Sequence, residues 1–265
     1  MGRPRKVHVQ TTLAFRRLDR NQQRRGGKRK GAGRKAKLDE HGRRRMSHVA
    51  RPAIDPRHPQ HVTLRVSPEL GWMRRLDIYL ALRITLRAML AHASTFRIVH
   101  YSLQNTHLHL IVEANDKAAL TFGMRAFQIS AAKRINASVS RRRRLLTRRR
   151  GLVFVDRYHA EGLSSVRQVR NALSYVLNNW RRHAADHETS LQLCGGHLDP
   201  YASGHAFAGW SEQLPAAGRL PRDYGPAPAC APRTWLLSTG WAKAKPISCF
   251  EIPGPRPRAQ FEAMD

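Results

Sequence analysis

Two histidines two residues apart, in the stretch Gln104–Val112, constrain this chain most strongly, because the stretch alternates polar and apolar residues like a β-strand. Successive strand side chains point to opposite faces of a sheet. Asn105, His107 and His109 are therefore predicted to share one face, and the apolar residues between them the other. Two neighbouring imidazoles can chelate a divalent metal if a third ligand comes from elsewhere. With 14 histidines in the chain, such a pair also arises by chance, so other residues must support this interpretation.

The charge of the chain indicates its partner. The sequence has 48 Lys or Arg against 18 Asp or Glu, a formal net charge of +30. Such a chain repels itself unless a polyanion neutralises it, and nucleic acid is the usual one. An anionic membrane is the rival partner, but no long apolar run or lipidation motif supports it. No apolar stretch follows the first basic residues, so we expect a cytoplasmic, nucleoid-associated protein. The three cysteines are too widely spaced to form a disulfide framework or a zinc knuckle.

Residues 1–58 carry 19 Lys or Arg against 4 acidic residues and have no apolar periodicity. Such a segment cannot bury enough surface to fold alone, so it is predicted to be a disordered basic arm. Within it, Arg3 and Arg5 flank a proline and resemble the centre of an AT-hook, which reads a narrow minor groove. The leading arginine of that motif is missing, and plain phosphate contact by these two arginines is the alternative.

The segment 59–187 is predicted to be a single folded domain. Hydrophobic periodicity predicts strands over 61–66, 96–103, about 107–112 and 152–159, and helices over 72–92, 116–138 and 164–183. This order is that of an α+β fold with a ferredoxin-like antiparallel sheet, helices on one face and an added C-terminal helix. The other face is expected to be open, with the two histidines on it. Residues 188–265 are rich in Gly and Pro and are predicted to be an appended, poorly structured tail of unknown role.

The last predicted helix supplies a second cluster of interest. Its apolar residues recur at spacings of three and four and predict a buried ridge. Tyr175 lies about 160° around the helix from Leu173, and Asn179 follows Tyr175 by one turn. A helical tyrosine usually packs in a core, but other residues already fill this ridge. Tyr175 and Asn179 are therefore predicted to stand together off the core.

Taken together, these residues resemble a known family. The motif His107-Leu108-His109 after Asn105, then Arg157-Tyr158-His159, then Tyr175-Val176-Leu177-Asn178-Asn179, is similar to the REP-associated tyrosine transposases. These are IS200-like, single-tyrosine members of the H-U-H transposases, where U is a bulky apolar residue. The resemblance covers roughly residues 61–183 and lies in the combination, since each piece alone is weak.

The resemblance implies a DNA transposase. It makes His107, His109 and Asn179 ligands of Mg²⁺ or Mn²⁺ and Tyr175 the nucleophile that forms a 5′-phosphotyrosine and leaves a free 3′-hydroxyl. The implied substrate is single-stranded DNA, often beside a hairpin, and the implied assembly is a monomer or homodimer. Where the family usually has proline after this asparagine, the chain has Trp180, so the helix should continue.

A basic loop is predicted at 141–150, close to the site in this topology. Such arginines bind phosphate without reading bases, although a solvated loop is the plainer interpretation. The candidate DNA-binding residues of this region are Arg141, Arg142, Arg143, Arg144, Arg148, Arg149, Arg150 and Arg157. Tyr158 is a rival nucleophile because Arg157 and His159 flank it, but it has no polar partner at helical spacing.

Three other functions are alternatives to a DNA transposase. The first is a catalytically inert relative that binds hairpin DNA through the same surfaces. The second, an RNA-binding ferredoxin-like domain, would need exposed aromatic residues on the central strands for base stacking, where this chain has histidines. The third, a histidine-triad hydrolase, would need a third alternating histidine, but Ile111 occupies that position.

Overall fold

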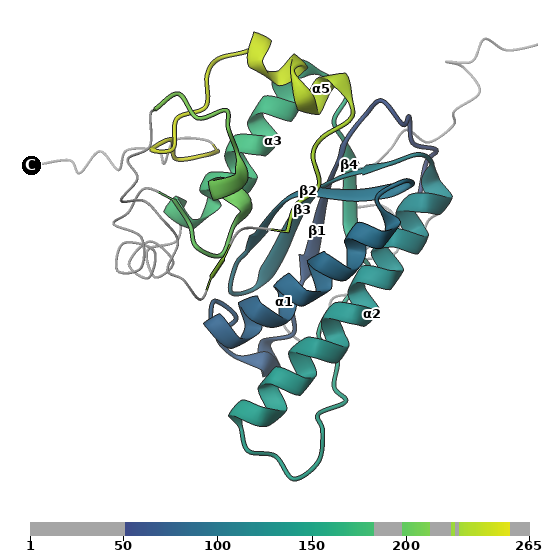
Figure 1. Ribbon diagram of the computed structural model, residues 1–265, viewed down its shortest axis with the longest axis vertical. Helices are drawn as coiled ribbons and strands as arrows, with labels where there is room; N and C mark the ends of the chain where they lie inside the picture. Colours follow the sequence, from purple (N-terminus) through teal and green to yellow (C-terminus); the bar gives the residue numbers. More distant parts are fainter. Residues whose placement is uncertain (1–50, 183–197, 213–223, 226–227, 255–265) are drawn as a thin grey trace, which may run out of the picture. The chain divides into compact units, whose positions relative to one another are not determined.

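The computed structural model describes residues 51–182, 198–212, 224–225 and 228–254 (Figure 1). Four antiparallel strands form one sheet in the order β2-β3-β1-β4. The strands are β1 (Gln60–Arg65), β2 (Phe96–Leu103), β3 (His107–Ala114) and β4 (His159–Gly162). The helices are α1 (Leu76–Met89), α2 (Lys117–Arg142), α3 (Val166–Asn178) and α5 (Trp235–Ser238). Short 3-10 helices span Pro68–Leu70, Leu90–His92, Asn179–Arg182, Ser203–Ala206 and Gly240–Lys243. The predicted ferredoxin-like α+β fold is confirmed.

Helices α1 and α2 pack side by side on one face of the sheet, as predicted (Figure 1). The alternating apolar residues of the strands, such as Leu64 and Leu110, are buried beneath them. Asp116 is the N-cap of α2, and its carboxylate accepts a hydrogen bond from the Ala119 amide at 2.7 Å.

Helix α3 lies on the opposite face, so that face is less open than expected (Figure 1). Ser165 and Gln168 form a capping box at its start. The ridge of α3 packs on Ile111 of β3 and on Val99, which sits where the pairing register of β2 shifts. These apolar contacts hold α3 over one half of this face. The half that carries the histidines lies beside the helix.

The predicted strand 152–159 is misplaced, because β4 starts only at His159. The preceding apolar run makes separate contacts along the end of β1 instead: Val153 O accepts from Ser67 N at 2.9 Å, and Val155 N donates to Arg65 O at 3.2 Å. Their apolar side chains suggested a strand, yet no regular ladder forms there.

Helix α1 begins at Leu76 and not near Trp72, and the cause is Asn105. The Asn105 side-chain oxygen accepts from Met73 N at 3.2 Å and from Arg74 N at 3.1 Å. These bonds hold the chain before α1 in a non-helical conformation. Asn105 therefore lies in the turn before β3. The prediction that it shares the face of the two histidines was wrong. α2 in turn runs past Ser138 to Arg142.

The prediction of a poorly structured tail was wrong for the described residues after 197. Tyr201 O accepts from Leu103 N at 3.0 Å, and Cys230 N donates to Ile98 O at 2.9 Å, so the tail covers the free edge of β2. Farther along, Leu236 and Ile247 are buried against α3. Gly and Pro remove any periodicity from this segment, but its isolated apolar residues still dock on the domain.

One buried ion pair fastens this tail to the domain and gives a stability prediction. Asp199 receives two hydrogen bonds of 2.8 Å from Arg74, and both side chains are fully buried. In Asp199→Ala the guanidinium stays buried without its carboxylate, which typically costs about 3–5 kcal/mol. We expect urea denaturation to show that loss. Asp55→Ala is the control, because its Arg57 partner is 83% exposed and should contribute nothing measurable. Equal stability of the two variants would contradict the fastening role of Asp199.

No helix in the described part of the chain is long and apolar enough to span a membrane.

Candidate active site

The histidine half of the second sheet face is assembled from β1 and β3. The pairing register places Arg65 opposite His107 and Thr63 opposite His109. His61 lies two residues before Thr63, so it projects on the same face. The predicted sharing of one face by His107 and His109 is confirmed.

Three imidazoles form a row on this face. The rings of His107 and His109 are stacked, with centroids 6.0 Å apart and planes at 20°. On the other side of His109, the His61 ring is stacked at 5.5 Å and 28°. His107 is half-buried and His109 is buried, so the row runs from the edge of the sheet into its packed surface.

Threonine hydroxyls fix both histidines of the motif. Thr63 Oγ1 lies 3.2 Å from His109 Nδ1, and Thr106 Oγ1 lies 2.7 Å from His107 Nδ1. A hydrogen bond at one ring nitrogen fixes ring orientation and tautomer. A role as metal ligand would therefore fall to Nε2 of each ring.

Tyr175 comes from α3 and meets this row edge-on. Its ring centroid lies 5.3 Å from that of His109 at 86°, and 5.8 Å from that of His61 at 69°. The side chain is half-buried and packs at the margin of the α3 core. The structure therefore brings Tyr175 and His109, which lie 66 residues apart in the sequence, into contact within one chain.

His61 belongs to this cluster and was missed in the sequence. Burial, with repulsion from His159 as the lesser cause, lowers its pKa to about 4, so the ring is neutral at neutral pH. Its Nε2 is buried and has no hydrogen-bond partner among the described residues. The alternation of the first predicted strand places the His61 side chain away from the core, but alternation alone does not set the strand register that brings it beside His109.

Asn179 follows Tyr175 by one turn, at the start of the 3-10 helix Asn179–Arg182. The chain continues helically through Trp180, as expected without proline. Asn179 is only 3% exposed, so the prediction that it stands off the core was wrong. The cause is Trp180, which is fully buried and draws this turn into the packed interior.

The rival nucleophile Tyr158 lies elsewhere. It is 5% exposed and belongs to the core under α1 and α2, on the face opposite His109. Its hydroxyl is buried without a hydrogen-bond partner in the described part of the chain, and Arg51 stacks over its ring at 3.7 Å. A phosphodiester cannot reach this hydroxyl in the described structure.

The predicted arginines divide into two groups. Arg142 pairs with Asp77 at 3.0 Å and Arg149 with Glu69 at 2.7 Å, so these two serve the fold. The second group has exposed side chains and comprises Arg141, Arg143, Arg144, Arg148 and Arg150. Arg157 is half-buried.

Two of these positions differ from the expectation of a basic loop, because Arg141 and Arg142 form the last turn of α2. Arg3 and Arg5 lie outside the described residues.

Among the described residues, no three His, Cys, Asp or Glu side chains gather as a metal-binding group. His61 therefore does not complete such a group with the two motif histidines.

Comparisons with known proteins show what this part of the chain is similar to. Residues 80–179 match the model of the family described as "Transposase IS200 like". A solved structure of a REP-associated tyrosine transposase bound to a REP hairpin is similar at 14% identity and a TM-score of 0.40, covering 66% of this chain and 98% of that one. No curated protein matches the chain. The matched segment contains His107, His109 and Tyr175 and ends at Asn179, so the candidate site lies within the part of the chain that is similar to this family.

Proposed function

We propose that the chain cleaves one DNA strand and transfers it through a covalent bond to Tyr175. The observation that carries this proposal is the edge contact, at 5.3 Å between centroids, of the half-buried Tyr175 with His109. A candidate nucleophile and a pair of candidate metal ligands thus meet on one sheet face. Because one chain supplies both, the site can be completed without a partner subunit.

The reaction conserves the energy of the broken bond. The Tyr175 oxygen attacks phosphorus and loses its proton to solvent, while the 3′ oxygen of the broken bond leaves and gains a proton. The product is a 5′-phosphotyrosine, which the same or another 3′-hydroxyl can reverse without ATP. A phenol with a pKa near ~10 is a poor nucleophile at neutral pH, so the phosphate must be made more electrophilic.

The residues present fit a divalent metal. Two imidazoles, whose Nδ1 atoms lie within hydrogen-bond distance of threonine hydroxyls, offer two nitrogen donors, and the amide oxygen of Asn179 would add an oxygen donor. We propose that His107, His109 and Asn179 hold Mg²⁺ or Mn²⁺. When bound, the ion would offset the charge that develops on a non-bridging phosphate oxygen. The chain itself orients the imidazoles through Thr63 and Thr106 and places Tyr175 against His109.

Single-stranded DNA beside a hairpin is the proposed substrate. The net charge of +30 favours a polyanion, and the arginines exposed around the end of α2 supply phosphate contacts. A monomer or a homodimer is compatible with a site that one chain completes.

The test of this proposal uses the full chain with single-stranded hairpin DNA from the flank of its own gene. With Mg²⁺ present, we expect a protein-linked DNA band on a denaturing gel and a free 3′-hydroxyl on the other fragment. Tight hairpin binding without any linked band, with the chain folded and metal present, would support the inert hairpin-binding alternative instead.

The basic arm gives a separate prediction. Deletion of residues 1–50, which spares Arg51 and its contact with Tyr158, should weaken binding to every DNA about equally and flatten the salt dependence. Each lost phosphate contact should remove about 0.9 of a unit from the log-log slope on duplex and about 0.7 on single strands. Titration of A·T-rich and G·C-rich duplexes at several salt concentrations measures this. A selective loss on A·T-rich duplex, shared by Arg3→Ala, would favour minor-groove reading instead.

A further inference from the structure

The segment after α2 projects from the domain, and the leucine at its tip, residues 145–148, is wholly exposed. Leu146 has a relative accessibility of 104%, and its neighbour Leu145 is 45% exposed. Single exposed leucines are common on proteins. This one is unusual because arginines lie on both sides of it, at 143–144 and at 148–150.

The chain enters this tip through a fixed turn. Arg144 N donates to Arg141 O at 3.2 Å, and Leu145 N donates to Ser140 O at 3.0 Å, which together form a Schellman motif. Glycine usually occupies the C′ position of that motif, because this position needs a positive φ. Here Arg144 adopts φ 51°, the one described residue other than glycine with a positive φ. A bulky residue in this conformation is strained. An arginine nevertheless occupies this position, directly beside the tip.

The chain leaves the tip through a second anchor. Arg149 N donates to Ser140 Oγ at 2.8 Å, and its guanidinium donates to Asn136 at 2.6 Å and to Glu69 at 2.7 Å. Asn136 in turn donates to Gly151 O at 2.9 Å. Ser140 thus receives both ends of the segment, and residues 145–148 project from a closed base.

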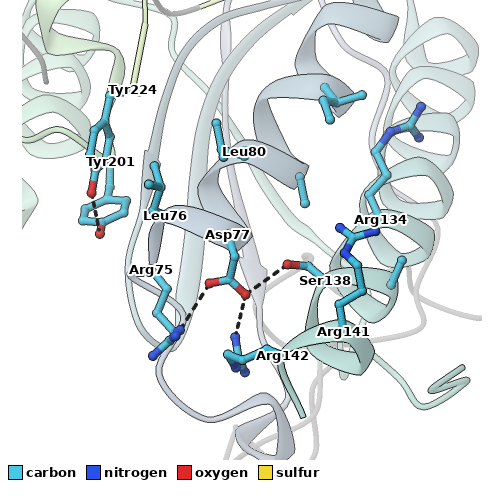
Figure 2. Close-up of a pocket in the computed structure, with 13 residues that line it drawn as sticks. Arg75, Leu76, Asp77, Leu80, Arg134, Ser138, Arg141, Arg142, Tyr201 and Tyr224 are labelled. Carbon is cyan, nitrogen blue, oxygen red and sulfur yellow. Dashed lines mark hydrogen bonds and ion pairs between the residues drawn. The ribbon is translucent and has the colours of Figure 1, made fainter. Parts of the chain in front are cut away.

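A cationic groove lies next to this base. It is a cavity of about 1100 Å³ between α1 and α2, with an apolar floor that includes Leu80 (Figure 2). Arg134, Arg141 and Arg142 line it from the end of α2. Its one acidic lining residue, Asp77, is engaged by Arg75, Arg142 and Ser138, so the groove offers net positive charge to an anion.

The base of the tip is connected to the candidate active site through a series of hydrogen bonds. Val66 N donates to Thr106 O at 2.9 Å, one residue before His107, and Ser67 N donates to Val153 O at 2.9 Å. Glu69, two residues further, holds Arg149. A short path of bonded chain therefore links the base of the tip to the histidine end of the sheet.

We infer that Leu146 is a wedge that inserts at the foot of a DNA hairpin and unstacks the base next to the stem, while the surrounding arginines hold the phosphates. Proteins that unstack DNA use apolar side chains presented beside cationic ones in this way. The inference rests on the proposed function in taking DNA as the partner. A basic, leucine-tipped segment could also insert into an anionic membrane, but the similarity to a transposase family and the groove beside the tip favour DNA.

The experiment uses a hairpin DNA with 2-aminopurine next to the stem, whose fluorescence rises when the base unstacks. Wild-type protein should raise this signal on binding. Leu146→Ser should lose the rise and bind the hairpin roughly tenfold more weakly, as expected when one apolar contact to a base is removed. Affinity for a continuous duplex should change less than about twofold. Leu146→Met, which keeps an apolar wedge, should retain the signal.

Leu90→Ser is the matched control, because Leu90 is 43% exposed and follows the other end of α1. Since Leu146 has no packing to lose, Leu146→Ser should keep the wild-type melting temperature. An unchanged fluorescence rise in Leu146→Ser would overturn the wedge. So would an absent rise in the wild type together with Leu146-dependent binding to phosphatidylserine vesicles, which would assign the tip to a membrane.

This result is separable from that of the proposed function. A fluorescence rise that depends on Leu146, without any covalent product, would leave the wedge standing and remove the cleavage. A covalent product with no dependence of the rise on Leu146 would do the reverse.

Discussion

Tyr175→Phe should abolish the covalent protein–DNA product and leave DNA affinity within about twofold of wild type. The substitution removes only the hydroxyl that would attack phosphorus, and the phenylalanine ring can keep the edge contacts with His61 and His109. Loss of a nucleophile removes covalent catalysis altogether, whereas loss of a packing contact changes only its rate. Labelled hairpin DNA on a denaturing gel measures the adduct, and anisotropy measures the affinity.

Tyr158→Phe is the matched control, since it makes the same change at the rival tyrosine. It should keep the full amount of adduct, because the Tyr158 hydroxyl is buried on the other side of the sheet. An adduct that persists in Tyr175→Phe and disappears in Tyr158→Phe would reverse the assignment. Adduct formation in both single variants would point to a nucleophile other than these two tyrosines.

The fold follows from local signals wherever one dominates. Alternation placed His107 and His109 on one face, and the helices predicted from 116 and from 164 start within two residues of the N-caps Asp116 and Ser165. Each of these signals acts within a few residues, so the sequence alone carries it. Residues three or four apart on α3 likewise gave its buried ridge.

The errors have a common physical origin in contacts between distant segments. Asn105 delays the start of α1 through bonds to a segment about 30 residues earlier. His61 joins the site only through the strand register, and Asn179 is buried because Trp180 beside it packs inward. The tail docks through Asp199, which reaches Arg74 across 125 residues. Neither residue propensity nor hydrophobic periodicity can predict which distant residues make such contacts.

The proposed metal site gives the second large effect. His107→Ala and His109→Ala should each remove DNA cleavage, and EDTA should do the same to the intact protein and be reversed by added Mg²⁺ or Mn²⁺. The two imidazoles stack side by side, so each alanine would remove half of the proposed nitrogen donors. Adduct yield measures cleavage, and calorimetric titration with Mn²⁺ measures binding independently of activity. His92→Ala, at an exposed histidine after α1, should change neither.

Two further variants should have smaller effects than the histidine variants. Asn179→Ala should be milder than either histidine variant, because water can replace a neutral amide oxygen. Thr63→Val leaves all three proposed ligands in place but removes the hydroxyl 3.2 Å from His109 Nδ1, so Mn²⁺ should bind about tenfold more weakly. If Thr63 only packs, Mn²⁺ affinity will stay at the wild-type value in Thr63→Val. Full cleavage in EDTA would remove the metal from the proposal altogether and leave Tyr175 to act with the neighbouring imidazoles alone.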